Sequence, residues 1–232
     1  MVSGDVWESA QAAEREYWVS DEWRGLSYEQ RLSEWQRHLS ELGLAWGEFE
    51  KKRVLDVGCG PVGIGYFLKA RRRVGIDPLA DVYAPTNGQW GEPIELVEGV
   101  GESIPFPDQS FDAVFCINAL DHTRSPSEVV RELRRVLAIG GLLVFHTDLD
   151  SPIRHARKYV VRGDAHLHPH HLSMRWLESQ LDGFEITKIH RDLQVFRGQR
   201  FHDAAFWDGM LYRLTRLPAF MNHVWLSALR SA

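Results

Sequence analysis

Between residues 51 and 146, short apolar runs alternate with glycine-containing turns and with stretches whose apolar residues recur at helical spacing. This alternation is typical of β-α-β units and predicts an open, doubly wound α/β sheet. The run over 113–117 is apolar throughout, which suits a strand covered on both faces. The strands predicted in this region are Arg53–Val57, Arg73–Ile76, Ile94–Val97, Ala113–Ile117 and Leu142–Phe145.

Two further strands are predicted by the alternating segment Phe184–Ile189 and by the apolar segment His223–Leu229, which gives a mostly parallel sheet of seven strands. Helices are predicted from the glycine turn at residue 58 to about Ala70, over Ser127–Leu137, over Ser173–Leu181 and over residues 203–217.

The first 50 residues are predicted to be a helical arm. Ser27, with Gln30 three residues later, has the pattern of a capping box, and apolar residues then recur at helical spacing until Gly43. Five of the nine tryptophans lie in this arm; packing on the domain is the favoured role, and covering a substrate pocket is the alternative. The expected organisation is a cap over residues 1–50 and a domain over 51–232, with insertions at about 147–172 and 194–222.

The net charge of −5 is unevenly spread: residues 1–50 hold eleven acids and four bases, or −7, which leaves +2 for the remainder. No strongly basic face is expected, which argues against a nucleic-acid partner. The two cysteines, Cys59 and Cys116, make no disulfide framework. Neither a leader segment nor a run of about 18 apolar residues is present, so we expect a cytoplasmic protein without membrane contact.

A glycine-rich turn follows the first predicted strand. Gly58, Gly60 and Gly63 form G-x-G-x-x-G within VLDVGCGPVGIGYF, and Asp77 comes 19 residues after Gly58. This spacing fits a dinucleotide site. However, the carboxylate of Asp56 at the strand's end would oppose a pyrophosphate and attract an ammonium group. S-adenosylmethionine carries an ammonium and a sulfonium but no phosphate, so it fits this turn better than NAD.

Four ordered blocks carry a resemblance to a known family. VLDVGCGPVG (54–63), VGIDP (74–78), GESIPFPDQSFDAVFCINALDH (101–122) and RELRRVLAIGGLLVF (131–145) are similar to motifs of the class I S-adenosylmethionine-dependent methyltransferases. The resemblance covers about residues 50–146. It implies a Rossmann-like fold, S-adenosyl-L-methionine as cofactor and methyl transfer as the activity.

The resemblance also implies the cofactor contacts. Asp77 would bind the ribose hydroxyls and Asn118 would border the methionine part; a turn cap is the alternative role of Asn118. Many relatives carry an Asp where Val100 stands, so Glu102 or a backbone carbonyl is expected to serve the adenine, unless Glu102 is a solvated loop acid. The full set is Asp56, Gly58, Cys59, Gly60, Asp77, Pro78, Gly101, Glu102, Ser103 and Asn118.

Methyl transfer mainly requires alignment of the nucleophile, and a hydroxyl nucleophile also requires a base. Candidate bases should follow the fourth and fifth strands, where Asp121, His122 and His146 stand. We predict His122 or His146 as the base, although the acid–histidine pair after the fourth strand can also be structural.

The segment 147–172 is rich in histidine and arginine. Arg154 and Arg157 suit an anionic acceptor, and a solvated face is the alternative. Pro169 interrupts HLHPHH and no cysteine pair accompanies it, so a metal site is not expected. Some family members have a similar His-Pro-x-His stretch near the acceptor pocket, which implies that role for His170 and His171.

The leading hypothesis is a biosynthetic methyltransferase that acts on a small molecule, at a hydroxyl of a sugar or glycan precursor or of a natural product. The alternatives are an NAD-dependent oxidoreductase and a non-catalytic S-adenosylmethionine-binding protein. The tryptophans of the arm would also allow a homodimer contact.

Overall fold

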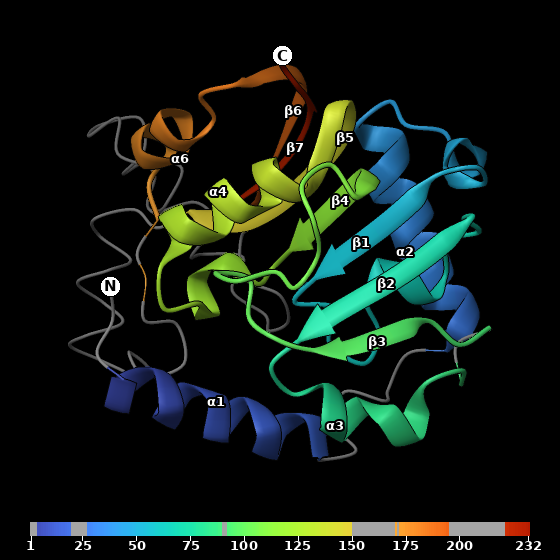
Figure 1. The fold of residues 1–232 in the computed structure, drawn as a ribbon, viewed down its shortest axis with the longest axis vertical. Helices are drawn as coiled ribbons and strands as arrows, with labels where there is room; N and C mark the ends of the chain where they lie inside the picture. The colour runs from blue at the N-terminus through green and yellow to red at the C-terminus, as the bar shows by residue number, and fades with distance from the viewer. Residues whose placement is uncertain (1–3, 20–26, 90–91, 150–169, 171, 195–220) are drawn as a thin grey trace, which may run out of the picture.

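A seven-stranded sheet forms the centre of the computed structural model, which describes residues 4–19, 27–89, 92–149, 170, 172–194 and 221–232 (Figure 1). The strand order is β3-β2-β1-β4-β5-β7-β6. The first five strands pair in parallel, whereas β7 is antiparallel to both of its neighbours, so the predicted mostly parallel sheet is confirmed. The strands are β1 (Arg53–Val57), β2 (Arg72–Asp77), β3 (Glu95–Glu98), β4 (Phe111–Ile117), β5 (Leu137–Leu149), β6 (Phe184–Gln194) and β7 (Met221–Arg230).

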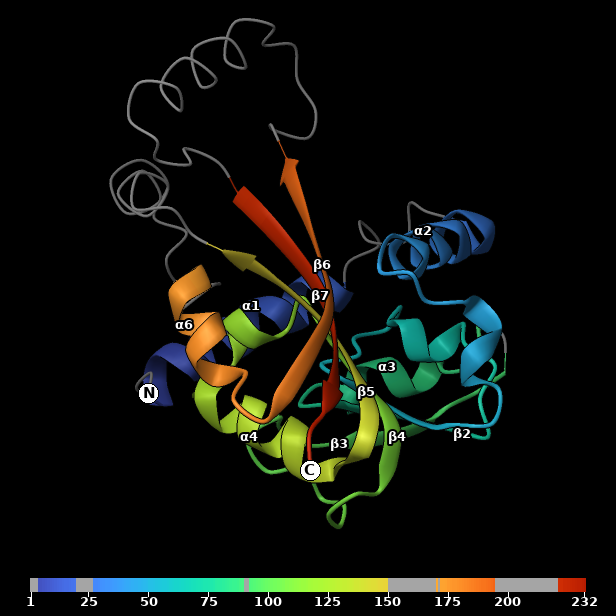
Figure 2. The same ribbon diagram turned by 90° about the horizontal axis from the view of Figure 1, so that it is seen from above.

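Helices cover both faces of the sheet (Figures 1 and 2). On one face, Leu133 of α4 and Leu177 of α6 join a buried apolar cluster with β4 and β5; on the other, Leu39 of α2 joins a second cluster. The helices are α1 (Gly4–Val19), α2 (Tyr28–Glu41), α3 (Ala80–Tyr83), α4 (Pro126–Val136) and α6 (Met174–Gln180). Short 3-10 turns are η2 (Trp46–Phe49), η3 (Ile64–Tyr66), η4 (Ala84–Thr86) and η5 (Leu120–His122).

The predicted arm consists of two helices with different positions. α2 begins at the predicted capping box, in which the Gln30 backbone N–H donates to Ser27 Oγ at 3.3 Å and the Ser27 N–H donates to Gln30 Oε1 at 2.8 Å. α1 instead runs, beside α3, past the carboxyl ends of β1 and β2 (Figure 1). The strand order reverses between β1 and β4, and a crevice at such a reversal is where ligands bind in open α/β sheets.

The predicted helix between the glycine turn and Ala70 is wrong. Only the 3-10 turn η3 forms there, because the chain folds closely around the buried side chain of Asp56. The Gly65 backbone N–H donates to Asp56 Oδ2 at 2.9 Å, and a Cβ atom at Gly63 would collide with that carboxylate and with the Cys59 carbonyl. Glycine and proline are poor helix formers, so the local sequence gives little support to a helix that would displace this packing.

The remaining expectations differ from the structure mainly at element ends. β5 extends well beyond the predicted Leu142–Phe145, because residues 146–149 continue to pair with β7. The helix predicted over residues 203–217 lies outside the described residues. Within the described part of the chain, no helix combines the length and the apolar character needed to cross a bilayer.

Candidate functional site

A cavity of about 470 Å³ lies between α1 and the carboxyl ends of the parallel strands. Its volume is in the range typical of small-molecule sites, about 300–1,000 Å³. We call it the cofactor cavity. The sheet side of its wall is formed by Gly58, Gly60, Ile76, Asp77, Pro78, Leu79, Tyr83, Gly99, Val100, Gly101, Glu102, Asn118, Ala119, His122 and Thr123. The α1 side is formed by Trp7, Gln11, Ala13, Glu14, Tyr17 and Trp18.

The glycine turn brings bare backbone to the cavity wall. Gly58 has φ +69°, in the left-handed region that favours glycine, and a Cβ atom there would collide with the side chain of Ala119. Its N–H donates to the Ile76 carbonyl at 2.8 Å, which ties the turn to β2. The turn therefore allows a ligand to approach the main chain closely, and Gly58 and Gly60 lie where the sequence predicts them.

Asp56 lies beneath the turn rather than in the cavity wall. Its side chain is only 2% exposed, and its Oδ2 accepts the Gly65 N–H. Burial raises the pKa of Asp56 to about 7, so this carboxyl is not a fixed charge at neutral pH. The predicted contact with an ammonium group is therefore not direct in this geometry, and the carboxyl instead holds the glycine turn. Cys59 is likewise buried beneath the turn.

Asp77 stands at the end of β2 and lines the cavity. Its Oδ2 accepts the Gly60 N–H at 3.0 Å and its Oδ1 accepts the Leu79 N–H at 2.9 Å. The Tyr83 side chain is a further hydrogen-bond partner. Burial is the main cause that raises the pKa of Asp77 to about 6. The carboxyl group is thus fixed in orientation, as a group that accepts ribose hydroxyls would need to be.

The loop after β3 supplies another part of the wall through Val100, Gly101 and Glu102. Oε1 of Glu102 accepts the backbone N–H groups of Arg124 at 2.6 Å and Ser125 at 3.0 Å. Because Ser125 is the N-cap of α4, Glu102 satisfies amides at the start of that helix. Ser103 is exposed and does not line the cavity.

Asn118, directly after β4, also lines the cavity. Its φ of +52° is unusual for a residue other than glycine, and asparagine tolerates it better than most residues. The Asn118 N–H donates to the His146 carbonyl at 3.1 Å, which holds this conformation against β5. A backbone of this kind is often found at functional sites.

His122 is the predicted base that reaches the cofactor cavity. Its Nδ1 lies 3.3 Å from Oε1 of Glu14, and its Nε2 lies 3.9 Å from Oδ1 of the buried Asp121. The two carboxyl groups approach the imidazole from α1 and from η5. This arrangement orients the ring.

His146, the other predicted base, does not line the cavity. Its side chain is buried and packs against Trp225 of β7, with ring centroids 4.4 Å apart. His38 of α2 stacks on the same indole at 4.1 Å. His146 therefore belongs to the packing between α2 and the sheet in this structure.

Sequence reasoning missed the residues that α1 contributes to the wall. Trp7, Gln11, Glu14 and Trp18 share one face, because they are separated by four, three and four positions. That spacing was the available signal: polar side chains stand between tryptophans on one helical face. Trp7 and Trp18 line the cofactor cavity, whereas Trp35 and Trp46 pack on apolar clusters, so the favoured packing role is seen for two of the five and a role over a substrate pocket stays a prediction.

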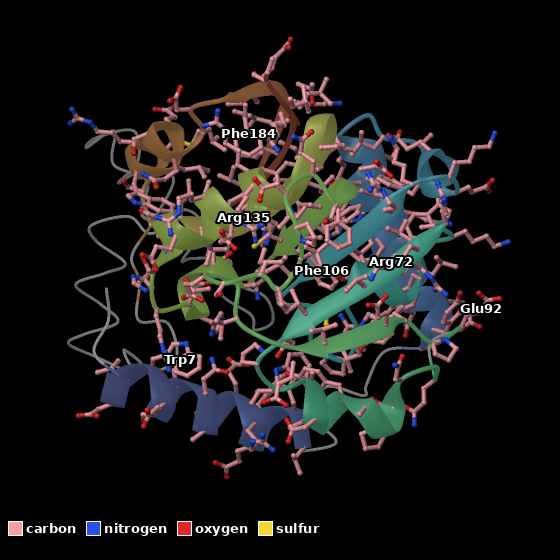
Figure 3. All side chains as sticks on the ribbon, viewed as in Figure 1. Trp7, Arg72, Glu92, Phe106, Arg135 and Phe184 are labelled. Carbon is pink, nitrogen blue, oxygen red and sulfur yellow. The ribbon has the colours of Figure 1, made fainter. Side chains whose placement is uncertain are left out.

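Polar and aromatic contacts hold α1 in place. Arg15 forms two 3.0 Å hydrogen bonds with the Asp81 carboxylate of α3, and the Trp18 indole N–H donates to Glu14 at 2.9 Å. At the other end, the Arg124 guanidinium lies 3.9 Å from the centroid of Trp7. Figure 3 shows Trp7 pointing from α1 toward the body of the domain.

The predicted acceptor residues are only partly described. The ring of His170 contacts the carbonyl of Thr123, a cavity-lining residue, at 2.7 Å, and burial lowers the pKa of this histidine. Arg154, Arg157 and His171 lie outside the described residues. Among the residues that the structure places, no group of three His, Cys, Asp or Glu side chains could hold a metal ion.

The cavity fits S-adenosylmethionine better than a dinucleotide. No lysine or arginine of the described chain lines it, whereas Glu14, Asp77 and Glu102 do. The helix that would direct its N-terminus at a pyrophosphate is replaced by the short turn η3. Both observations disfavour phosphate groups and favour a cationic cofactor.

Comparisons with known proteins agree with this geometry. Residues 55–145 match the family profile described as a methyltransferase domain. A probable methyltransferase of Aspergillus luteorubrus is 32% identical over 140 residues, which are 48% of this chain and 49% of that protein. The tRNA U34 carboxymethyltransferase of Ectopseudomonas mendocina is 34% identical over 146 residues, 56% of this chain and 38% of its own length. The chain therefore spans about half or less of these relatives.

A solved structure shares the fold. Geranyl diphosphate C-methyltransferase from Streptomyces coelicolor A3(2), in complex with Mg²⁺, geranyl diphosphate and S-adenosyl-L-homocysteine, superposes with a TM-score of 0.61. The sequence identity is 16%, and the match covers 87% of this chain and 80% of that one. At this identity, the likeness concerns the fold.

Proposed function

We propose that this chain, which carries a class I S-adenosylmethionine-dependent methyltransferase domain, is an enzyme that methylates a small molecule at a hydroxyl group. The observation that carries the proposal is the covered cofactor cavity, in which the glycine turn, Asp77, Asn118 and His122 share one wall. A sugar or glycan precursor or a natural product is the proposed acceptor class, in a biosynthetic role.

The chain's own groups would hold the cofactor by position and charge. Asp77 would accept the ribose hydroxyls, and the backbone at Gly58 and Gly60 would lie against the methionine part, bordered by Asn118. When bound, S-adenosylmethionine supplies a methyl carbon that a nucleophile attacks in line with the departing sulfur. α1 would exclude water from that carbon, because its side chains form the opposite wall.

His122 would remove the proton of the acceptor hydroxyl. A proton taken by the imidazole makes it positively charged, and the carboxyl groups of Glu14 and Asp121 are placed to stabilise that charge. The expected products are a methyl ether and S-adenosyl-L-homocysteine, with the proton passing from His122 to solvent.

The charges of the cavity wall and of the N-terminal residues favour a small acceptor over RNA. One relative acts on tRNA by name, but nucleic-acid sites depend on lysine and arginine for phosphate contacts. No lysine or arginine side chain of the described residues lines this cavity, and the N-terminal 50 residues carry a net −7. The segments at about 147–172 and 194–222 are proposed to complete the acceptor pocket, with Arg154, Arg157, His170 and His171 facing an anionic group.

The test is a methyl-transfer screen that measures S-adenosyl-L-homocysteine formation over hydroxyl, amine and carboxylate acceptors. With the acceptor found, His122→Ala should lower turnover by about 10²- to 10⁴-fold, the usual contribution of a general base, while cofactor affinity changes little. His146→Ala is the matched control, because this histidine packs on Trp225 and does not line the cavity.

Normal turnover in the His122 variant would reject the base assignment alone. Cofactor binding without turnover on any acceptor would favour the non-catalytic alternative, and turnover on RNA alone would reject the small-molecule acceptor. Binding of NADH without binding of S-adenosylmethionine would reject the whole proposal.

A further inference from the structure

The methionine part of the cofactor carries an ammonium group, and the acid expected to meet it does not reach the cavity. Asp56 is 2% exposed, lies beneath the glycine turn and does not line the cofactor cavity. A positive charge that leaves water for a cavity needs a partner there, because burying an unpaired charge is costly. A different carboxyl group on the cavity wall is therefore expected to face the ammonium group.

Among the described residues, three carboxyl groups line the cavity, and two of them are engaged elsewhere. Both oxygens of Asp77 accept backbone N–H groups, and this side chain is proposed to hold the ribose. Oε1 of Glu102 accepts the backbone N–H groups of Arg124 and Ser125 at the start of α4. The third carboxyl group is that of Glu14 on α1, whose side chain is 24% exposed and so remains open to a ligand.

Contacts on two sides place Glu14 opposite the glycine turn. On the side of β4, its Oε1 lies 3.3 Å from His122 Nδ1. On the side of β1, its Oε2 accepts the Trp18 indole N–H at 2.9 Å, and the Trp18 ring comes within 3.7 Å of the position that a Cβ atom of Gly60 would take. Besides burial, the charge of Glu14 helps to raise the pKa of Asp77, as expected of two carboxyl groups on one cavity. Glu14 thus faces the part of the wall proposed to receive the methionine part.

We infer that Glu14 binds the ammonium group of the methionine part of S-adenosylmethionine, with its carboxylate accepting the ammonium N–H groups. The inference rests on the cofactor of the proposed function. A carboxylate has about four acceptor sites, so its contacts with Trp18 and His122 leave capacity for a ligand. α1 would then do more than cover the cofactor, because it would also recognise the charged end.

The test is a binding series measured by calorimetry without any acceptor. The ligands are S-adenosyl-L-homocysteine, its analogue with hydrogen in place of the α-amino group, and 5′-methylthioadenosine, which lacks the amino-acid end. Wild-type protein should bind the deaminated analogue about tenfold more weakly than S-adenosyl-L-homocysteine, the value of one charge-assisted hydrogen bond. In Glu14→Gln this ratio should fall to about threefold, because a hydrogen bond to a neutral acceptor is about half as strong. Affinity for 5′-methylthioadenosine should not change.

Two features keep the result interpretable. Glu14→Gln retains an oxygen that can accept the Trp18 N–H, and Glu16→Gln, which changes an exposed acid of α1 outside the cavity wall, should behave as wild type. Melting temperatures of both variants report folding.

Three results would overturn the inference while leaving the proposed function intact. Wild-type protein could bind the deaminated analogue as tightly as S-adenosyl-L-homocysteine, Glu14→Gln could keep the wild-type ratio, or it could lose affinity for all three ligands alike. Failure of wild-type protein to bind S-adenosyl-L-homocysteine would overturn both.

Discussion

The helices α1 and α2 come from the same N-terminal segment but meet the sheet in different ways. α2 buries an apolar stripe, in which Leu39 is almost fully inaccessible and packs with Phe115 and Val144. α1 has one fully buried residue, Ala10, and directs indole, carboxamide and carboxylate groups at a cavity. The first arrangement stabilises the domain and leaves little room for a ligand; the second leaves polar groups that a ligand can satisfy.

This difference shows how a helix's inward face indicates its role. A stripe of aliphatic residues is satisfied by the sheet itself, because dispersion and burial need no specific partner. An inward face of mixed polarity needs hydrogen-bond partners, and Gln11 lacks one among the described residues. The comparison predicts that changes in α2 alter stability and changes in α1 alter ligand affinity.

The largest effect is expected from the α2 side. Leu39→Ala should lower the free energy of unfolding by about 2–5 kcal/mol, the usual cost of truncating a buried leucine. Affinity of the folded protein for S-adenosyl-L-homocysteine should stay within about twofold of wild type. Urea unfolding and calorimetry measure the two quantities; a large loss of affinity without loss of stability would contradict the division of roles.

A smaller effect, on ligand affinity rather than on stability, is expected from a change in α1. Trp18→Ala removes the hydrogen bond to Glu14 and the edge contact with Tyr83, whose ring centroid is 6.2 Å away. Ligand affinity should fall about tenfold, because the indole forms part of the cavity wall, whereas the two lost contacts should lower the free energy of unfolding by no more than about 1–2 kcal/mol. Exposed Val19→Ala, which changes a residue outside the cavity wall, is the comparison on the same helix. If Trp18→Ala chiefly lowers the melting temperature, α1 is part of the packed core.

The pH dependence of cofactor affinity is a further test that the cavity side, and not α2, controls ligand binding. Burial raises the pKa of Asp77 to about 6 and that of Asp56 to about 7, so protonation removes negative charge from the cavity region as the pH falls. A cationic cofactor should therefore bind several-fold more weakly at pH 5.5 than at pH 7.5. Asp77→Asn and Asp56→Asn should each make cofactor affinity vary less with pH. Calorimetry between pH 5.5 and pH 7.5 measures this. Leu39→Ala should leave its shape unchanged.

The sequence predicted the sheet well because its strands follow local patterns. β1 has the predicted bounds, and α2 starts at the predicted capping box, since each depends on residues adjacent in the chain. Three residues predicted at the cofactor site from motifs that end strands, Gly58, Asp77 and Asn118, all line one cavity, and their contacts with the cofactor stay a prediction.

The sequence predictions were wrong where residues far apart in the chain determine the local structure. The missing helix after β1 depends on the fit of Gly63 and Gly65 around the buried carboxyl of Asp56, which no periodicity reveals. The role of α1 depends on its placement over strand ends far along the chain, through partners such as Asp81 and Arg124. His146 resembles a base by position, but its partner Trp225 lies on a later strand.

The place of β7 in the sheet has a consequence for how the chain is made. β7 lies between β5 and β6, so β6 has no neighbour to join until residues 221–230 have left the ribosome. Pairing between strands so distant in sequence is slow, and until it occurs the open edge of β5 is exposed to other chains. A growing chain is therefore open to aggregation through this edge until β7 has paired.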